Sequence, residues 1–129
     1  MNKAEFKTLR EALGFSQVDL ARFAGVQDRT VRRWESVDYS SYNPPEDVIN
    51  ALNALDLNLD NAAMEAVVTA KTVGSKTVRV DLFRFKTNAE LWEAHPDMKD
   101  LPTSTHAVLL FRAKQLLEKY GFKVEIYYL

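Results

Sequence analysis

The sequence contains no cysteine, only 4 glycines and 4 prolines, and no long apolar run. The absence of cysteine excludes a disulfide framework, a thiolate metal site and a thiol nucleophile. Apolar runs reach about five residues, whereas a membrane-spanning helix needs about 20. A large net charge is also absent, because 17 basic and 18 acidic residues leave a formal charge of -1. A polybasic coat is therefore excluded, and any contact with nucleic acid requires a local basic patch.

The 129 residues are 47% hydrophobic and 27% charged, which is typical of one ordinary globular domain or two small modules. Met1 to Glu5 carry charge where a secretory signal needs an apolar core. We therefore expect a cytoplasmic protein without membrane contact. The two histidines, His95 and His106, are separated by ten residues without a helping cysteine. We expect no metal site and no cofactor.

Apolar residues recur every three or four positions through the first 71 residues, which predicts amphipathic helices. Gly14 and Gly25 separate the first three helices, and Ser16 with Asp19 forms a capping-box pattern at the start of the second. The expected helices, about five in number, are residues 3–13, 16–23, 28–36, 45–55 and 59–71.

After Gly74 the apolar period changes from about 3.6 residues to about 2, which predicts a strand over residues 77–85. The alternation slips near Leu82 and Phe83, which indicates a bulge or burial on both faces. A short helix from Thr87, a long helix over 104–120 and a strand over 122–129 follow. The fold class is therefore α+β: an all-α domain at residues 1–72 and a small β-α-α-β module at residues 76–129.

The third expected helix places Val31 and Trp34 on an inner face and three arginines, Arg29, Arg32 and Arg33, on the outer arc. The short turn at Gly25 leaves that arc exposed. A helix fits the major groove of DNA, where arginine pairs with the two acceptors of guanine or with phosphates. The pattern therefore indicates a face that reads double-stranded DNA, as opposed to an ordinary solvated helix face.

The stretch from Leu13 to Glu35 reads L-G-F-S-Q-V-D-L-A-R-F-A-G-V-Q-D-R-T-V-R-R-W-E. It resembles the Cro/cI-type helix-turn-helix of phage and bacterial repressors, the XRE family. The shared features are Ser16-Gln17, Leu20-Ala21, Gly25-Val26, Thr30-Val31 and Arg33-Trp34-Glu35, and the resemblance covers about residues 3–57.

The resemblance implies a role for each matching position. Gln17 opens the second helix and holds a phosphate, and Gln27 caps the third helix. Base contacts are implied for Asp28, Arg29 and Arg33, with Asp28 either accepting from cytosine or orienting Arg32, and phosphate contacts for Arg32 and Thr30. Arg10 and Glu35 match a pair that often forms an ion pair. In the loop over 37–43, the candidates for backbone contacts are Tyr39, Ser40, Tyr42 and Asn43.

A helix-turn-helix followed by a strand-helix-helix-strand module also resembles the anti-CRISPR-associated autorepressors and related bacterial proteins. The likeness lies between Phe83 and Tyr120 and includes the turn at His95, Pro96 and Asp97. This resemblance implies that the C-terminal module dimerises and that the protein represses its own operon.

The long helix over 104–120 carries an apolar arc wider than one packing contact requires. The arc forms either the core of a single chain or a core shared by two chains. A module of about 54 residues makes a thin core by itself, which favours the shared one. The expected interface residues are Leu109, Leu110, Ala113, Leu116, Leu117, Tyr120, Val124, Ile126 and Tyr128.

The sequence therefore predicts a homodimeric, sequence-specific repressor that binds an inverted-repeat operator. Two alternatives stay open: an antitoxin that binds a protein partner through its C-terminal module, and a regulator that binds structured RNA with the same helix. An enzyme is not expected, because the sequence shows no nucleophile with its base, no phosphate-binding loop and no metal quartet.

Overall fold

The computed structural model describes residues 1–73 and 79–129. Three short helices open the chain: α1 (Lys3–Ala12), α2 (Gln17–Ala24) and α3 (Asp28–Glu35). The long helix α4 (Glu46–Val73) follows. The C-terminal elements are β1 (Arg79–Arg84), α5 (Asn88–Ala94), a 3-10 turn (Pro96–Met98), α6 (Thr103–Lys119) and β2 (Lys123–Tyr128). The predicted α+β class and the strand-helix-helix-strand order are confirmed.

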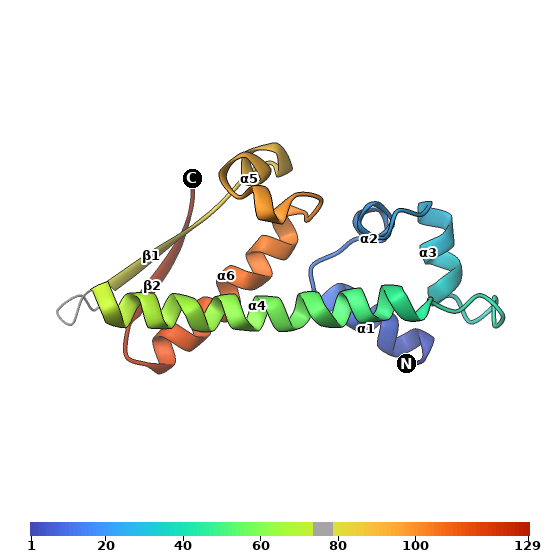
Figure 1. Ribbon diagram of the computed structural model, residues 1–129, viewed down its shortest axis with the longest axis horizontal. Coiled ribbons are helices and arrows are strands. Elements are labelled where there is room, and N and C mark those ends of the chain that lie inside the picture. Colours follow the sequence, from blue (N-terminus) through green and yellow to red (C-terminus); the bar gives the residue numbers. More distant parts are fainter. Residues whose placement is uncertain (74–78) are drawn as a thin grey trace.

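Helix α4 runs along the length of the molecule, with α1, α2 and α3 at one end and the two strands near the other (Figure 1). We expected two helices here, over 45–55 and 59–71, and about five before the first strand. That expectation is wrong, because the 28 residues from Glu46 to Val73 form one helix. The sequence has neither glycine nor proline between these ends, and the buried stripe Leu52, Leu55, Leu59, Ala63 and Val67 continues at spacings of three and four.

The expected capping box at α2 is confirmed. The Ser16 hydroxyl accepts from the Asp19 backbone N–H at 3.0 Å, and the Asp19 carboxylate accepts from the Ser16 N–H at 3.1 Å. These contacts satisfy two donors that a helix start leaves without intrahelical partners. Gly25 ends α2 at φ 69°, in the left-handed region, so the chain turns directly into α3.

Strands β1 and β2 pair in parallel, with Val80 beside Val124 and Leu82 beside Ile126. The pairing is continuous from Arg79 to Arg84 and burial alternates along β1, so the predicted bulge, or burial on both faces, is wrong. Phe83 belongs to the exposed face instead, with its ring 6.1 Å from that of Tyr127. Residues 77 and 78 of the expected strand lie outside the described residues.

The main apolar core contains residues from both ends of the chain. Phe6, Leu20 and Leu52 belong to the same buried cluster as Phe85 and Leu91. A second cluster joins Val67 of α4, Leu117 of α6 and Val124 of β2. The division into residues 1–72 and 76–129 stays a prediction, although these contacts show that the two parts share their packing.

Helix α6 is joined to the turn between α1 and α2 by side-chain hydrogen bonds. The buried Thr105 hydroxyl donates to the Leu13 carbonyl at 2.7 Å, and the Ser104 hydroxyl donates to the Gly14 carbonyl. Gly14 has φ 80°, and a Cβ there would lie 2.6 Å from the Ser104 carbonyl oxygen. The close approach of the two backbones therefore requires glycine.

Candidate nucleic-acid interface

Helix α3 is held by its inner face, so that its outer face is free. Val31 and Trp34 are buried, and the Trp34 ring meets the Phe6 ring of α1 edge to face at 6.1 Å. Arg29 and Arg32 project from the exposed side. The predicted division of α3 into a core face and an arginine face is what the structure shows.

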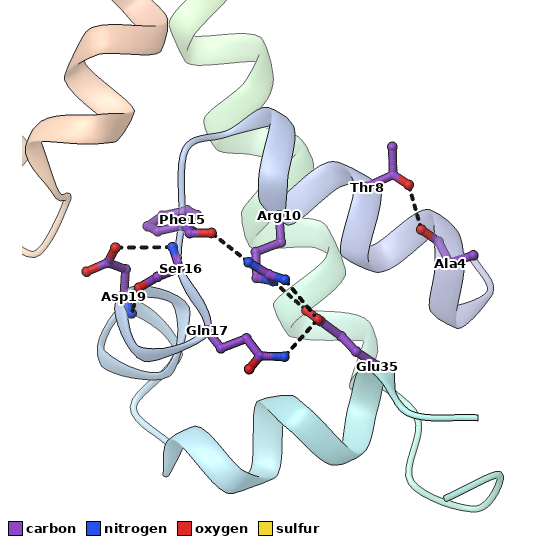
Figure 2. Close-up of polar contacts among 8 residues, drawn as sticks. All are labelled: Ala4, Thr8, Arg10, Phe15, Ser16, Gln17, Asp19 and Glu35. Atoms are coloured by element: carbon purple, nitrogen blue, oxygen red, sulfur yellow. Dashed lines mark hydrogen bonds and ion pairs between the residues drawn. The ribbon is translucent and has the colours of Figure 1, made fainter. Parts of the chain in front are cut away.

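A buried ion pair ties the end of α3 to α1, as expected (Figure 2). Arg10 Nε donates to Glu35 Oε2 at 2.6 Å, and Nη2 donates to Oε1 at 3.0 Å. Arg10 Nη1 donates to the Phe15 carbonyl at 2.8 Å. The two side chains are 8% and 4% exposed. The pair is bidentate and is further hydrogen-bonded, which suits a structural role.

Gln17 opens α2 as expected, and its side chain points towards the same ion pair (Figure 2). Its Nε2 donates to Glu35 Oε1 at 3.1 Å, which holds the amide at the edge of the arginine face. Gln27 occupies the N-cap position of α3, but its side chain makes no capping hydrogen bond within the described part of the chain. The phosphate contact expected of Gln17 stays a prediction, and the cap expected of the Gln27 side chain is not formed by the described residues.

Asp28 and Arg32 form an ion pair one turn apart on the exposed face of α3. Arg32 Nη1 donates to Asp28 Oδ2 at 2.8 Å. This hydrogen bond, with the charge of Arg32, holds the pKa of Asp28 below its ordinary value. Of the two roles expected for Asp28, orienting Arg32 is the one that the free protein adopts. Acceptance from cytosine stays a prediction.

The loop after α3 folds back over Arg33. The Arg33 Cζ lies 5.5 Å from the Tyr39 ring centroid and 5.3 Å from that of Tyr42. The two rings meet edge to face at 5.8 Å. Asn43 closes the loop, since its Nδ2 donates to the Ser40 carbonyl at 3.3 Å. Of the four predicted loop residues, Tyr39 and Tyr42 therefore lie beside Arg33 of α3, whereas Asn43 and Ser40 bond to each other within the loop. Their contacts with DNA stay predictions.

A cavity of about 510 Å³ opens on this face. It joins α1, α2, α3 and the start of the loop, and four of its side chains are cationic. Its carboxylate, Glu35, already carries the Arg10 ion pair, so the opening favours an anion. The lining residues are Lys7, Gln17, Arg29, Arg32, Arg33, Glu35, Ser36 and Tyr39.

Two lysines of α1, Lys3 and Lys7, belong to this site and were missed in the sequence. Lys7 lines the cavity. Lys3 Nζ donates to three carbonyl oxygens, those of Arg33 and Trp34 at 3.0 Å each and that of Tyr42 at 2.6 Å. The signal in the sequence was their spacing of four on one face of α1, which an ordinary solvated face shares.

The residues 6–40 match a family model described as helix-turn-helix, and no curated protein matches the chain. The matched segment covers most of α1, all of α2 and α3, and the start of the loop after α3. This segment is a helix-turn-helix of the Cro/cI type, a DNA-binding regulatory domain and not an enzyme family. The match supports a DNA-binding regulator of the XRE type.

The predicted dimer interface divides into two sets by burial. Leu110, Ala113, Leu117 and Val124 are buried within the single chain. The other five are partly or fully exposed: Leu109, Leu116, Tyr120, Ile126 and Tyr128. Burial of the first set is explained without a second copy, and the interface itself stays a prediction.

Two further features of the described residues bear on function. Among them, no helix has the length and apolar content that a membrane crossing requires. The rings of His95 and His106 lie 5.7 Å apart, but residues 1–73 and 79–129 hold no group of three or more possible metal-ligating side chains.

Proposed function

We propose that the protein is a homodimeric transcriptional repressor that binds an inverted-repeat operator, including one at its own promoter. The observation that carries this proposal is the cationic outer face of α3, which continues into the cavity beside α1 and the loop. Occupation of an operator that overlaps a promoter blocks polymerase by steric exclusion.

The side chains on this face fall into two groups by their expected contacts. Arg29 and Arg33 are expected to meet base edges when α3 lies in the major groove, because arginine matches the two acceptors of guanine. Both line the cavity on this face, which supports that role. Lys7, Gln17 and Arg32 line the same cavity. Together with Thr30 they are expected to contact phosphates, which position the helix but carry no sequence information.

A dimer follows from the size of the binding face. One small module contacts about 600–1,000 Å² of DNA surface, which limits affinity and specificity. Two modules on a common axis read two half-sites about one helical turn apart. The members of the expected interface that remain available to a second copy are the exposed Tyr120 and Tyr128, with Tyr128 at 63% exposure the most open, and three half-buried residues.

The deciding experiment selects bound duplexes from a random pool with the full-length protein. We expect an inverted repeat with a fixed half-site spacing and a footprint of two protomers. A monomer in solution that enriches no duplex at moderate salt contradicts the proposal. Tighter binding to the protein's own leader transcript favours an RNA regulator instead, and co-purification with a small toxic partner favours an antitoxin.

Arg33→Ala tests the base-reading role on the selected duplex. We expect a loss of about 1–3 kcal/mol in specific binding, with relaxed preference at one base pair. The matched control is Lys86→Ala, which removes one exposed cation from the C-terminal part. Equal affinities of the Arg33 variant and the control refute a role for Arg33 in recognition.

A further inference from the structure

The guanidinium of Arg33 lies against two aromatic rings in the free protein. Its Cζ is 5.5 Å from the Tyr39 centroid and 5.3 Å from the Tyr42 centroid, within the roughly 6 Å over which a ring attracts a cation. Neither ring is buried, since Tyr39 is 44% and Tyr42 48% exposed. The two tyrosines are therefore held outside the core, at the side chain that the site most needs to orient.

The loop that carries these rings is anchored to the end of α3. Lys3 Nζ donates to the Arg33 and Trp34 carbonyls at 3.0 Å each and to the Tyr42 carbonyl at 2.6 Å. The carbonyls of a last helical turn lack intrahelical donors, and a lysine can satisfy them. Here one ammonium group satisfies two of them and fixes Tyr42 relative to α3.

We propose that Tyr39 and Tyr42 are positioning residues that hold Arg33 in the orientation with which it reads a guanine. This inference rests on the proposed function and deepens it. Arginine has many rotamers, and binding DNA normally restricts them; a side chain already ordered in the free protein loses less freedom on binding. The rings act through Arg33, and their hydroxyl groups are dispensable.

This role differs from the direct backbone contact expected for these tyrosines. A tyrosine that contacts a phosphate does so through its hydroxyl, so phenylalanine would abolish that contact. A ring that orients a cation keeps its effect in phenylalanine and loses it in leucine. The two roles therefore predict opposite results for the same pair of substitutions.

The test is a double-mutant cycle on the duplex selected by the wild type. We expect Tyr39→Leu with Tyr42→Leu to weaken binding about tenfold, and Tyr39→Phe with Tyr42→Phe to leave it within about twofold. In an Arg33→Ala background the leucine pair should cause no further loss, because the tyrosines then have nothing to orient. A leucine effect that persists without Arg33, or a phenylalanine pair as weak as the leucine pair, overturns the proposal.

A measurement without DNA separates this inference from the proposed function. The Arg33 side-chain Nε–H resonance, assigned by its loss in Arg33→Ala, should be shifted by the two rings. It should return towards a free-arginine position in the leucine pair but not in the phenylalanine pair. An unchanged resonance in all variants overturns the positioning role.

An Arg33→Ala variant with unimpaired DNA binding contradicts the proposed function even where the resonance shows the rings in place. Unchanged urea unfolding of each variant confirms that it is folded.

Discussion

Two buried ionisable side chains, Arg10 in the helix-turn-helix and His106 in α6, differ in their hydrogen bonding. Arg10 is buried with Nε, Nη1 and Nη2 all donating, to Glu35 and to the Phe15 carbonyl. His106 is 5% exposed, and its Nδ1 finds no partner within residues 1–73 and 79–129. A buried charge is tolerated where its bonds are complete, whereas an imidazole with an unbonded nitrogen is driven to its neutral form.

The surroundings of His106 reinforce this difference. Burial is the main reason that its pKa falls from 6.5 to about 4, and the nearby His95 and Arg84 charges lower it further. The centroid of the Phe85 ring lies 5.5 Å from that of His106 and adds an apolar side chain to these surroundings. The N-terminal part thus contains a buried charged side chain, Arg10, whereas burial in the C-terminal part favours the neutral form of His106.

The largest effect should come from breaking the Arg10 ion pair. The buried Glu35 carboxylate accepts hydrogen bonds from two side chains, those of Arg10 and Gln17. Arg10→Met leaves it with the Gln17 amide as its one side-chain donor among the described residues. Removing one partner of a buried pair costs about 3–5 kcal/mol, and we expect that decrease in the free energy of unfolding measured by urea denaturation. A decrease below about 1 kcal/mol would show that the pair is no stronger than a surface pair.

Gly14→Ala should follow, because it disturbs the contact between the two parts of the molecule. The new Cβ combines a left-handed φ with a 2.6 Å approach to the Ser104 carbonyl oxygen. We expect a destabilisation of about 2–4 kcal/mol in the same assay. Gly25→Ala is the matched control: φ is 69°, but no described atom lies within 4 Å of its added Cβ, so about 1–2 kcal/mol is expected. Equal losses in the two variants would refute the close approach.

Acid should weaken the folded state through His106. Its folded pKa of about 4 lies below its ordinary value of 6.5, so the unfolded chain binds the proton first. The stabilisation is therefore complete above pH 6.5 and is lost as the pH falls from 6.5 towards 4. We expect about 1–3 kcal/mol from this group, measured as the difference in pH dependence between wild type and His106→Gln. Parallel curves for the two proteins over that range would contradict a buried neutral imidazole.

The smallest effect should come from the exposed counterpart of the Arg10 pair. Arg79 lies 3.0 Å from Asp81 and 3.6 Å from Glu125 on the open face of the sheet, and its side chain is 54% exposed. Arg79→Gln should change the free energy of unfolding far less than Arg10→Met does, and salt should reduce the difference further. A loss as large as that of Arg10→Met would mean that exposure does not govern these pairs.

The sequence predicted the N-terminal part well because its signals are local. Ser16 and Asp19 lie three residues apart, and Gly25 marks a left-handed turn. The Arg10–Glu35 pair joins residues far apart in the chain and followed from the family pattern instead. The prediction failed in the middle of α4, although neither glycine nor proline interrupts that segment. The residues between Leu55 and Leu59 read as a break, yet α4 continues through them.

The candidate site divides in the same way. The arginines of α3 were predicted from helical spacing, and the structure places Arg29 and Arg32 on the exposed face and Arg33 half-buried beside Tyr39 and Tyr42. The roles of Lys3 and of the two tyrosines were not predicted, because they depend on contacts between residues far apart in the chain. Lys3 bonds to carbonyl groups about 30 to 40 positions away, at the end of α3 and in the loop that follows it. Spacing along one helix carries no information about such a contact.

The unbroken helix α4 also limits how this chain can change its length. Its 28 residues extend about 42 Å, and it packs along α6 for part of that distance. Each added residue advances a helix by about 1.5 Å and turns it by about 100°. A single insertion between Leu52 and Val67 would therefore rotate the part of α4 after the insertion relative to the part before it. This rotation would expose the apolar stripe that α6 covers. We therefore expect evolutionary insertions and fusion joints in the surface loops, and a constant number of residues in α4.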